Sequence, residues 1–173
     1  MPTGEASYVC SMTTIEYVQG DATAPRGGGA RIIAHVCNDS GGWGKGFVLA
    51  LSRRWPGPEA AFRAWYADGF ALGDAQFVRV EPELWVANMV GQHGLRTKGS
   101  TAVPVRYAAI DTALGTLGDK ALELGASVHM PRIGCGLAGG EWSRVEPLVT
   151  RRLVARGVAV TVYDHEGGDA GRA

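Results

Sequence analysis

Two glycine-rich turns, each placed directly after an apolar run of β-type residues, constrain this chain more than any other feature. The first lies in ARIIAHVCNDSGGWGKGF, residues 30–47, and the second in SVHMPRIGCGLAGGEW, residues 127–142. In each, a run typical of a buried strand stops, glycines follow, and a helical pattern begins. Backbone N–H groups at the start of a helix, with no Cβ in the way, form a site for phosphate. Two such turns predict a site that closes over a diphosphate from both sides, and hence a nucleotide-like ligand.

Strand and helix patterns alternate along the whole chain. We expect strands at residues 14–19, 31–36, 75–81, 84–90, 127–130 and 158–163, and helices at 45–55, 59–66, 107–124 and from 142 to near Gly157. The two strands on either side of Pro82 read as a hairpin. Alternation of this kind predicts an α/β fold with a mixed, partly parallel sheet and helices on both of its faces. Ligands of such sheets bind beyond the carboxyl ends of the strands, where both glycine-rich turns begin.

The 173 residues are enough for one domain with a proper core, and the chain has no internal repeat or linker. We therefore expect a single domain over residues 13–165. Residues 1–12 are expected to be a disordered extension, and residues 166–173, EGGDAGRA, a disordered tail.

The composition argues against several classes of partner. The 17 basic residues balance the 17 acidic ones, so a surface for nucleic acid is not indicated. No stretch approaches the roughly 18 apolar residues of a membrane span. Cys10, Cys37 and Cys135 form no CxxC motif, which argues against a disulfide framework or a zinc ribbon and fits a reducing, cytoplasmic location. No motif indicates a metal or a cofactor, and nothing indicates oligomerisation, so a monomer is expected.

Neither turn matches a standard phosphate-binding motif. The first turn has no Ser or Thr after its Gly-Lys pair and no GxGxxG spacing. In the second, Gly134 and Gly136 are expected where the backbone approaches a ligand or takes a positive φ. The alternative for each turn is an ordinary connection between a strand and a helix. Cys135 is either a nucleophile or a space-filling residue between the two glycines, and the second interpretation is favoured because no histidine is near it in sequence.

A few polar residues complete the set of candidates. Asp21 follows Gly20 at a strand end, where it either accepts a hydrogen bond from an exocyclic amine such as that of adenine or stabilises a turn. His35 and His129 lie inside apolar strands and are interpreted as hydrogen-bonded core residues. The four histidines show no metal-ligand spacing, and no Ser-His-Asp, HExxH or paired-carboxylate motif occurs.

Several short motifs together resemble the macro domain, an ADP-ribose-binding module. They are GDAT at 20–23, AHVCN at 34–38, GGWGKG at 41–46, MPRIGCGL at 130–137 and TVY at 161–163. The resemblance extends over residues 14–164. It is strongest to the branch that contains the terminal ADP-ribose protein glycohydrolases and the ADP-ribose-1″-phosphate phosphatases. The family implies a three-layer α/β/α fold with ADP-ribose in a cleft across the sheet.

The resemblance also implies roles for individual residues. Asp21 holds the adenine amine, Asn38 contacts the distal ribose, and Tyr163 lies near the adenine. The first turn lines the phosphates and a ribose, and the second donates N–H groups to the diphosphate. The full set of implied ligand-binding residues is Asp21, Ala22, His35, Asn38, Gly42, Trp43, Gly44, Gly46, Phe47, Pro131, Ile133, Gly134, Cys135, Gly136, Leu137 and Tyr163.

This chain departs from the glycohydrolases at two catalytic positions. Those enzymes use a nucleophilic lysine just after the strand that matches residues 84–90, where this chain has Gly91-Gln92. They use an aspartate after the GCGL motif, where this chain has Ala138. Lys45 and Lys98 are nearby cations, but Lys45 begins a helix and more simply faces phosphate or solvent. Three residues are candidates for catalysis without that pair. Asp39 could act as a polarising or basic carboxylate, Asn38 could hold the attacking water, and Glu141 could serve as a second carboxylate.

The resulting expectation is a hydrolase that removes ADP-ribose from aspartate or glutamate esters of mono-ADP-ribosylated proteins. A carboxylate ester of ADP-ribose is already activated, so a positioned water and an oriented substrate can suffice. Two alternatives remain. One is a reader that binds ADP-ribose without turnover, which the missing lysine and aspartate favour. The other is a phosphatase acting on ADP-ribose-1″-phosphate.

Overall fold

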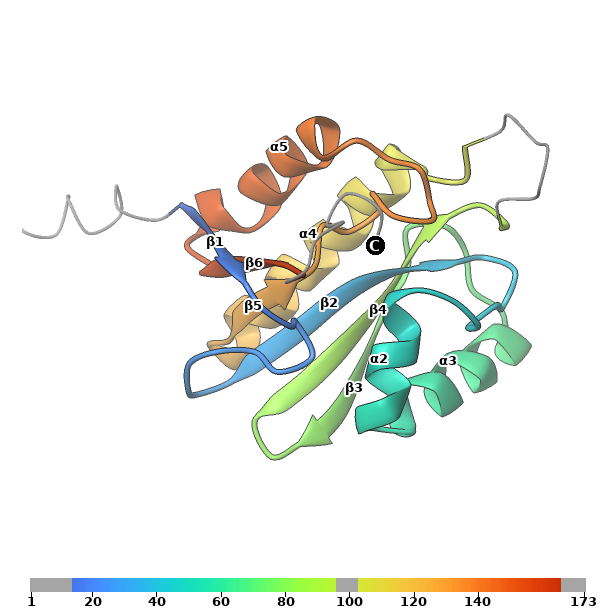
Figure 1. Ribbon diagram of the computed structural model, residues 1–173, viewed down its shortest axis with the longest axis horizontal. Coiled ribbons are helices and arrows are strands. Elements are labelled where there is room, and N and C mark those ends of the chain that lie inside the picture. Colours follow the sequence, from blue (N-terminus) through green and yellow to red (C-terminus); the bar gives the residue numbers. More distant parts are fainter. Residues whose placement is uncertain (1–13, 96–102, 166–173) are drawn as a thin grey trace, which may run out of the picture.

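A six-stranded mixed sheet with helices on both faces forms the protein in the computed structural model, which describes residues 14–95 and 103–165 (Figure 1). The strand order is β1-β6-β5-β2-β4-β3. The strands are β1 (Ile15–Gln19), β2 (Arg31–Asn38), β3 (Ala75–Glu81), β4 (Leu84–Gln92), β5 (Ser127–Met130) and β6 (Val160–Asp164). Only the β3–β4 pair is antiparallel, as the hairpin prediction requires. The expected α/β/α fold is confirmed.

The helices form two layers. On one side of the sheet lie α2 (Phe47–Arg54) and α3 (Gly57–Asp68), and on the other lie α4 (Tyr107–Leu124) and α5 (Trp142–Arg152), which is followed by the short 3₁₀ turn η1 (Val154–Arg156) (Figure 1). Each layer packs its own apolar cluster against the sheet. Strand β2 is therefore buried on both faces, which explains why its sequence is a continuous apolar run.

Several sequence-based boundaries differ from the observed ones by about two residues, and the last helix, α5, ends at Arg152 instead of near Gly157. The long helix at residues 107–124 is correct, and Gly125 ends it in the left-handed region with φ 63°. The helix expected from residue 45 begins at Phe47, because Gly46 takes φ 80°. Strands β2 and β4 each run two residues past their expected ends. Helix α3 starts at Gly57, since Pro58 fits the first turn of a helix instead of preventing it.

Arg152 of α5 and Arg156 of η1 form ion pairs with aspartates of α4, and both arginines lie close to glycines of that helix. The Arg152 Nε binds Asp111 Oδ1 at 2.8 Å, and Arg156 Nη2 binds Asp119 Oδ1 at 2.6 Å. An ideal Cβ built on Gly118 would lie 2.6 Å from the carbonyl oxygen of Arg152. The close approach of the two backbones therefore depends on glycine at position 118.

The parallel strands β1, β6, β5, β2 and β4 all end at the same edge of the sheet. Both glycine-rich loops leave from this edge, the first after β2 and the second after β5. Within the described ranges, no helix is both long and apolar enough to cross a membrane, and no three His, Cys, Asp or Glu side chains gather as metal ligands would. The disorder expected for residues 1–12 and 166–173 concerns residues outside the described ranges and stays a prediction.

Candidate functional site

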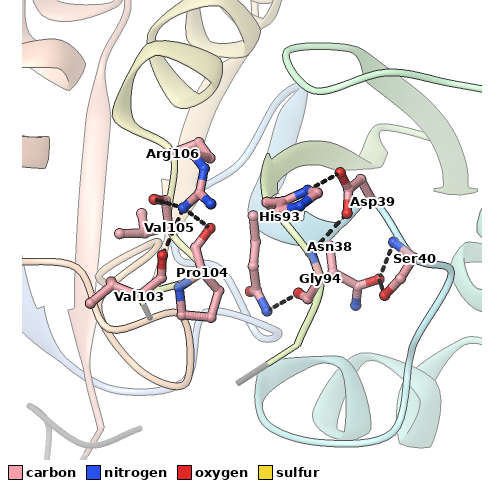
Figure 2. Close-up of polar contacts among 10 residues, drawn as sticks. Asn38, Asp39, Ser40, His93, Gly94, Val103, Pro104, Val105 and Arg106 are labelled. Carbon is pink, nitrogen blue, oxygen red and sulfur yellow. Dashed lines mark hydrogen bonds and ion pairs between the residues drawn. The ribbon is translucent and has the colours of Figure 1, made fainter. Parts of the chain in front are cut away.

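The first glycine-rich loop is shaped by the side chain of Asn38, the last residue of β2. Its Oδ1 accepts the N–H group of Ser40 at 2.9 Å (Figure 2). The same oxygen accepts the Gly42 N–H at 2.9 Å, and Nδ2 donates to the Gly42 carbonyl at 2.9 Å. Asn38 is only 7% exposed. Gly41 takes φ 84°, and a Cβ there would lie 2.7 Å from the ring of Tyr66. Asn38 therefore holds the loop from below, while its predicted contact with a ribose stays a prediction.

The loop ends at the start of α2 with open N–H groups. Gly46 is the N-cap, no side chain caps the helix, and the first turn has no acidic residue. A Cβ built on Gly44 would meet nothing within 4 Å, so its backbone faces open space. An uncapped helix start that follows an accessible glycine backbone is well suited to bind an anion.

The second loop folds back on itself after β5. The Gly140 N–H donates to the Gly134 carbonyl at 2.7 Å, and Gly134 takes φ 74° with its Cα packed close to Ile110. Among the described residues, the N–H groups of Ile133, Gly134, Gly136 and Leu137 have no hydrogen-bond acceptor. The macro domain resemblance implies that these four N–H groups and that of Cys135 bind a diphosphate. The Cys135 N–H instead donates to the Arg132 carbonyl at 3.3 Å.

Arg132 anchors this loop to the end of β6. Its Nε and Nη2 bind the two carboxylate oxygens of Asp164 at 2.6 and 3.0 Å. The guanidinium carbon lies 5.2 Å from the ring centre of Tyr17 and 5.5 Å from that of Trp142. A two-pronged ion pair flanked by aromatic rings fixes the start of the loop.

Cys135 is a poor candidate for a nucleophile. Its Sγ donates to the Ile133 carbonyl at 3.3 Å, and burial raises the pKa of the thiol to about 11. A thiol with so high a pKa carries almost no thiolate at neutral pH. The space-filling interpretation is the one that this environment favours.

The two loops meet across the edge of the sheet. A Cβ built on Gly46 in the first loop would lie 3.3 Å from Cδ1 of Leu137 in the second. Leu137 is nevertheless 49% exposed, so it lies at the outer rim. The open N–H groups of both loops are thereby brought to one place.

Asp21 forms the turn that follows β1. Its Oδ1 accepts the N–H of Thr23 at 2.8 Å and the Thr23 hydroxyl at 2.7 Å. The turn interpretation is therefore confirmed. Among the described residues, Oδ2 of this exposed carboxylate has no partner, so an adenine amine remains a predicted partner for it.

Tyr163 supports this turn from below. It is 4% exposed, and its hydroxyl accepts the N–H of Arg26 at 2.8 Å. The hydroxyl also shares a hydrogen bond with His129 Nδ1 at 2.8 Å, and His129 Nε2 shares one with Ser127 Oγ at 2.8 Å. His129 is thus a hydrogen-bonded core residue, as predicted. Tyr163 is close to the proposed adenine position but lies beneath the surface there.

His35 is likewise a hydrogen-bonded core residue. It is 2% exposed, its Nε2 lies 2.6 Å from Asn88 Oδ1, and its ring packs edge-on against Trp43. Burial lowers the pKa of His35 to about 4. Its inclusion among ligand-contacting residues is not supported by this position, because the side chain lies in the core below the first loop.

The other predicted site residues differ in how deeply their side chains are buried. Ala22, Trp43 and Ile133 are buried, Phe47, Pro131 and Cys135 are half-buried, and Gly44, Gly46 and Leu137 are exposed. Glu141 is exposed and is the N-cap of α5, where its own N–H donates to Tyr107 Oη at 3.0 Å. Lys45 is exposed beside the first loop, and Lys98 lies outside the described residues.

The end of β4 forms a bridge between the two loops (Figure 2). Asp39, the residue after Asn38, binds His93 Nδ1 through Oδ2 at 2.8 Å and accepts the Gly94 N–H on Oδ1 at 2.7 Å. Burial of the Asp39 carboxyl acts to raise its pKa, but the Gly94 N–H and His93 outweigh it and hold the pKa below its usual range. Both oxygens of the predicted base are therefore engaged.

Sequence reasoning did not single out His93 as a functional residue. The available signal was its place just beyond a strand that ends at the ligand-binding edge. Its partner Asp39 follows a different strand, so their contact depends on the parallel pairing of β2 and β4.

The structure also explains the missing lysine and aspartate. A Cβ on Gly91 would lie 2.7 Å from Ile110 and 3.2 Å from Val36, so a side chain has no room there. Gln92 is 8% exposed and donates to the Gly94 carbonyl at 2.9 Å. Ala138 is 5% exposed, and its carbonyl accepts the Val105 N–H. These positions serve packing and loop structure.

A separate groove of about 260 Å³ lies between β1 and α5. It is lined by Thr14, Ile15, Tyr17, Glu146, Thr150 and Val154. None of them belongs to either glycine-rich loop, so the backbone donors described above define the candidate site instead of this groove.

Comparisons with known proteins place the chain in a family. A macrodomain protein from Streptomyces coelicolor is 65% identical, with a TM-score of 0.79 over 88% of this chain and 99% of that one. A protein of unknown function from Bacteroides thetaiotaomicron is 51% identical, with a TM-score of 0.85 over 88% and 98%. The chain belongs to the macrodomain family.

More distant similarities agree with this assignment. Chromodomain-helicase-DNA-binding protein 1-like from Mus musculus is 32% identical over 161 residues, which are 87% of this chain. The chain spans only 18% of that protein. DarTG from Thermosipho africanus, solved in complex with ADP-ribose, is 20% identical with a TM-score of 0.70 over 89% of this chain and 42% of that one, and shares the fold. No family model matches the chain.

Proposed function

We propose that this macrodomain binds ADP-ribose and hydrolyses it from aspartate or glutamate side chains of mono-ADP-ribosylated proteins. The observation that carries the proposal is the meeting of two loops with open N–H groups, fixed by the contact of Leu137 with Gly46. A diphosphate supplies the acceptors that both sets of donors lack. The similarity of this chain to part of DarTG from Thermosipho africanus, which was solved in complex with ADP-ribose, supports the same ligand.

The order of the strands supports a specific orientation of the ligand. From β1 to β4 the edge presents the Asp21 turn, Tyr163 at the end of β6, the second loop after β5, the first loop after β2, and the Asp39–His93 pair. Neighbouring strands lie about 4.8 Å apart, so these features form a row of about 19 Å. ADP-ribose has the same linear order of groups: adenine, ribose, diphosphate and distal ribose. The bond to the modified side chain then lies at the β4 end.

Hydrolysis of an ester of ADP-ribose needs little activation by the protein. In an ester of ADP-ribose the leaving group is a carboxylate, which departs readily. Two rigid loops that hold the diphosphate fix the distal ribose relative to a water molecule, and such orientation lowers the barrier substantially. Backbone donors in the loops also need no reorganisation during the reaction.

A non-catalytic reader is the second candidate. Gly91 has no room for a side chain, and buried Ala138 stands where the glycohydrolases have an aspartate. A covalent lysine mechanism is therefore not available at these positions. A reader would bind ADP-ribose in the same site without hydrolysing it from a protein.

The test measures binding and turnover separately. Calorimetry with free ADP-ribose measures binding, and release of ADP-ribose from a target modified on glutamate or aspartate measures turnover. A target modified on serine is the control. Release from the acidic linkage alone supports the ester hydrolase, whereas binding without release from either target supports the reader. Phosphate release from ADP-ribose-1″-phosphate with neither protein target cleaved indicates the phosphatase, and absence of binding contradicts all three.

A further inference from the structure

We propose that His93, oriented by Asp39, is the general base that activates the hydrolytic water in this site. The inference rests on the proposed hydrolase function and names the residue that performs its proton transfer. It is carried by the Asp39–His93 contact and by its place at the β4 end of the row of ligand-binding features (Figure 2).

The contact between Asp39 and His93 determines which nitrogen of the His93 ring is free to accept a proton. An ionised carboxylate only accepts hydrogen bonds, so Nδ1 of His93 carries the proton that is shared with Asp39 Oδ2 at 2.8 Å. Nε2 then keeps its lone pair. The His93 side chain is 63% exposed, and among the described residues Nε2 has no partner. An imidazole held through Nδ1 by a carboxylate, with Nε2 facing solvent, is arranged as a base.

Asp39 is itself held in place by two backbone hydrogen bonds. The Gly94 N–H binds its Oδ1 at 2.7 Å, and its own N–H donates to the Gln92 carbonyl at 2.9 Å. The His93 N–H donates to the Pro104 carbonyl at 2.8 Å. Both members of the pair are therefore fixed by backbone hydrogen bonds. Asp39 is a positioning residue, and the proton acceptor is His93.

The segment that carries His93 contacts both loops. Leu95, two residues further on, lies 3.3 Å from a Cβ built on Gly42 in the first loop. Val105, which pairs with Gln92, donates to Ala138 in the second loop and packs against Gly134. The pair is thus tied to the same framework as the diphosphate donors. Among the described residues of this segment, the other charged group is Arg106, whose Nη1 donates to the carbonyls of residues 103–105.

The proposed step is the attack of water on C1″ of the distal ribose, with the carboxylate as leaving group. Nε2 of His93 takes a proton from water as the water oxygen bonds to C1″ of the distal ribose. The bond between C1″ and the ester oxygen breaks, and its electron pair stays with the departing carboxylate. The products are ADP-ribose with a hydroxyl at C1″ and a free acidic side chain, and the proton passes from His93 to solvent.

The central test is the variant His93→Asn, compared with wild type in kcat and in ADP-ribose affinity. The asparagine amide can replace Nδ1 as the donor to Asp39 but has nothing in place of Nε2. We expect kcat to fall by about 100-fold or more, the range of a lost general base. ADP-ribose affinity should stay within about twofold. Retention of wild-type kcat by this variant would overturn the role of His93.

Two further variants separate a base from a structural residue. In Asp39→Asn the new amide donates to Nδ1, which forces the proton onto Nε2 and removes the base without removing the ring. We expect loss of kcat with little change in KM, and nitrogen NMR should show the His93 tautomer reversed. In His93→Ala, added imidazole should restore part of the lost rate.

The results distinguish this inference from the proposed function. If wild type releases ADP-ribose and His93→Asn does so equally well, only the role of His93 is wrong. If wild type binds ADP-ribose but releases none, the hydrolase and its base are both wrong, and the reader remains. A wild-type His93 that carries its proton on Nε2 also contradicts the inference.

Discussion

Leu137 of the second glycine-rich loop lies over Gly46 of the first, so close that a Cβ on the glycine would stand 3.3 Å from the leucine Cδ1. Gly46 also takes φ 80°, a conformation that costs other residues about 1–2 kcal/mol. We expect Gly46→Ala to lower both the melting temperature and the affinity for ADP-ribose. Thermal unfolding and calorimetry on the same preparation measure the two effects.

Gly44→Ala is the matched control within the same loop. A Cβ at this position meets nothing, and the residue does not need a positive φ, so the melting temperature should not change. The added methyl group would nevertheless stand where the phosphates approach the backbone, and affinity should fall. An unchanged affinity would exclude this part of the loop from ligand binding.

Asp21→Asn tests the proposed adenine end of the site. The asparagine Oδ1 can keep the two hydrogen bonds to Thr23, so the turn should survive. The amide replaces the second carboxylate oxygen with a donor, which cannot accept a hydrogen bond from an amine. We expect ADP-ribose binding to weaken by about 1–3 kcal/mol, the scale of a hydrogen bond to a charged group, with no change in melting temperature. Equal affinity would remove Asp21 from the site.

Two buried histidines make stability depend on pH. Burial lowers the pKa of both His35 and His129 from 6.5 to about 4. Between these values the unfolded chain binds protons that the folded protein does not, so stability is highest above pH 6.5 and falls as the pH approaches 4. His35 alone accounts for a change of about 3 kcal/mol. Urea unfolding across this range should show the decline.

His35→Gln is the control for that pH dependence. The glutamine amide can still donate to Asn88 but does not titrate, so the slope of stability with pH should become shallower. His129 and the carboxylates whose pKa values are lowered, such as Asp39 and Asp164, supply the remaining slope. A slope identical to that of wild type would mean that His35 does not titrate in this range.

Gly118→Ala and Gly115→Ala should change stability in opposite directions. Replacing glycine by alanine inside a helix normally stabilises by about 0.5–1 kcal/mol. At Gly115 the new methyl would meet only the flexible end of Arg152, at 3.4 Å, so that gain is expected. At Gly118 it would lie 2.6 Å from the Arg152 carbonyl oxygen, and the helices must move apart at a cost of about 1–3 kcal/mol. Chemical denaturation of both variants measures the difference.

The elements of the fold were predictable because their signals are local. The apolar spacing along α4 and the glycine that follows it define a helix without help from the rest of the chain. Near the site the predictions were less exact, since Gly46 moves the start of α2 and the pairing of β2 with β4 extends both strands. Such shifts arise from tertiary contacts.

The two loops of the candidate site were predictable from the sequence, but the contacts between side chains around them were not. Glycine placement located both loops with open backbone N–H groups, and the macrodomain resemblance supplied the expected roles. The pairing of Asp39 with His93 was not accessible, because the two residues are 54 positions apart and meet only through the sheet. The supporting role of Tyr163 was missed for the same reason, because its partners Arg26 and His129 are distant in sequence.

The tight packing around Gly91 has an evolutionary consequence. A lysine at this position would collide with Ile110 and Val36, which belong to a helix and a strand in the centre of the fold. A single codon change therefore cannot install a lysine nucleophile there, because the core would have to be rebuilt at the same time. An exposed position such as His93 can instead be substituted without disturbing the interior.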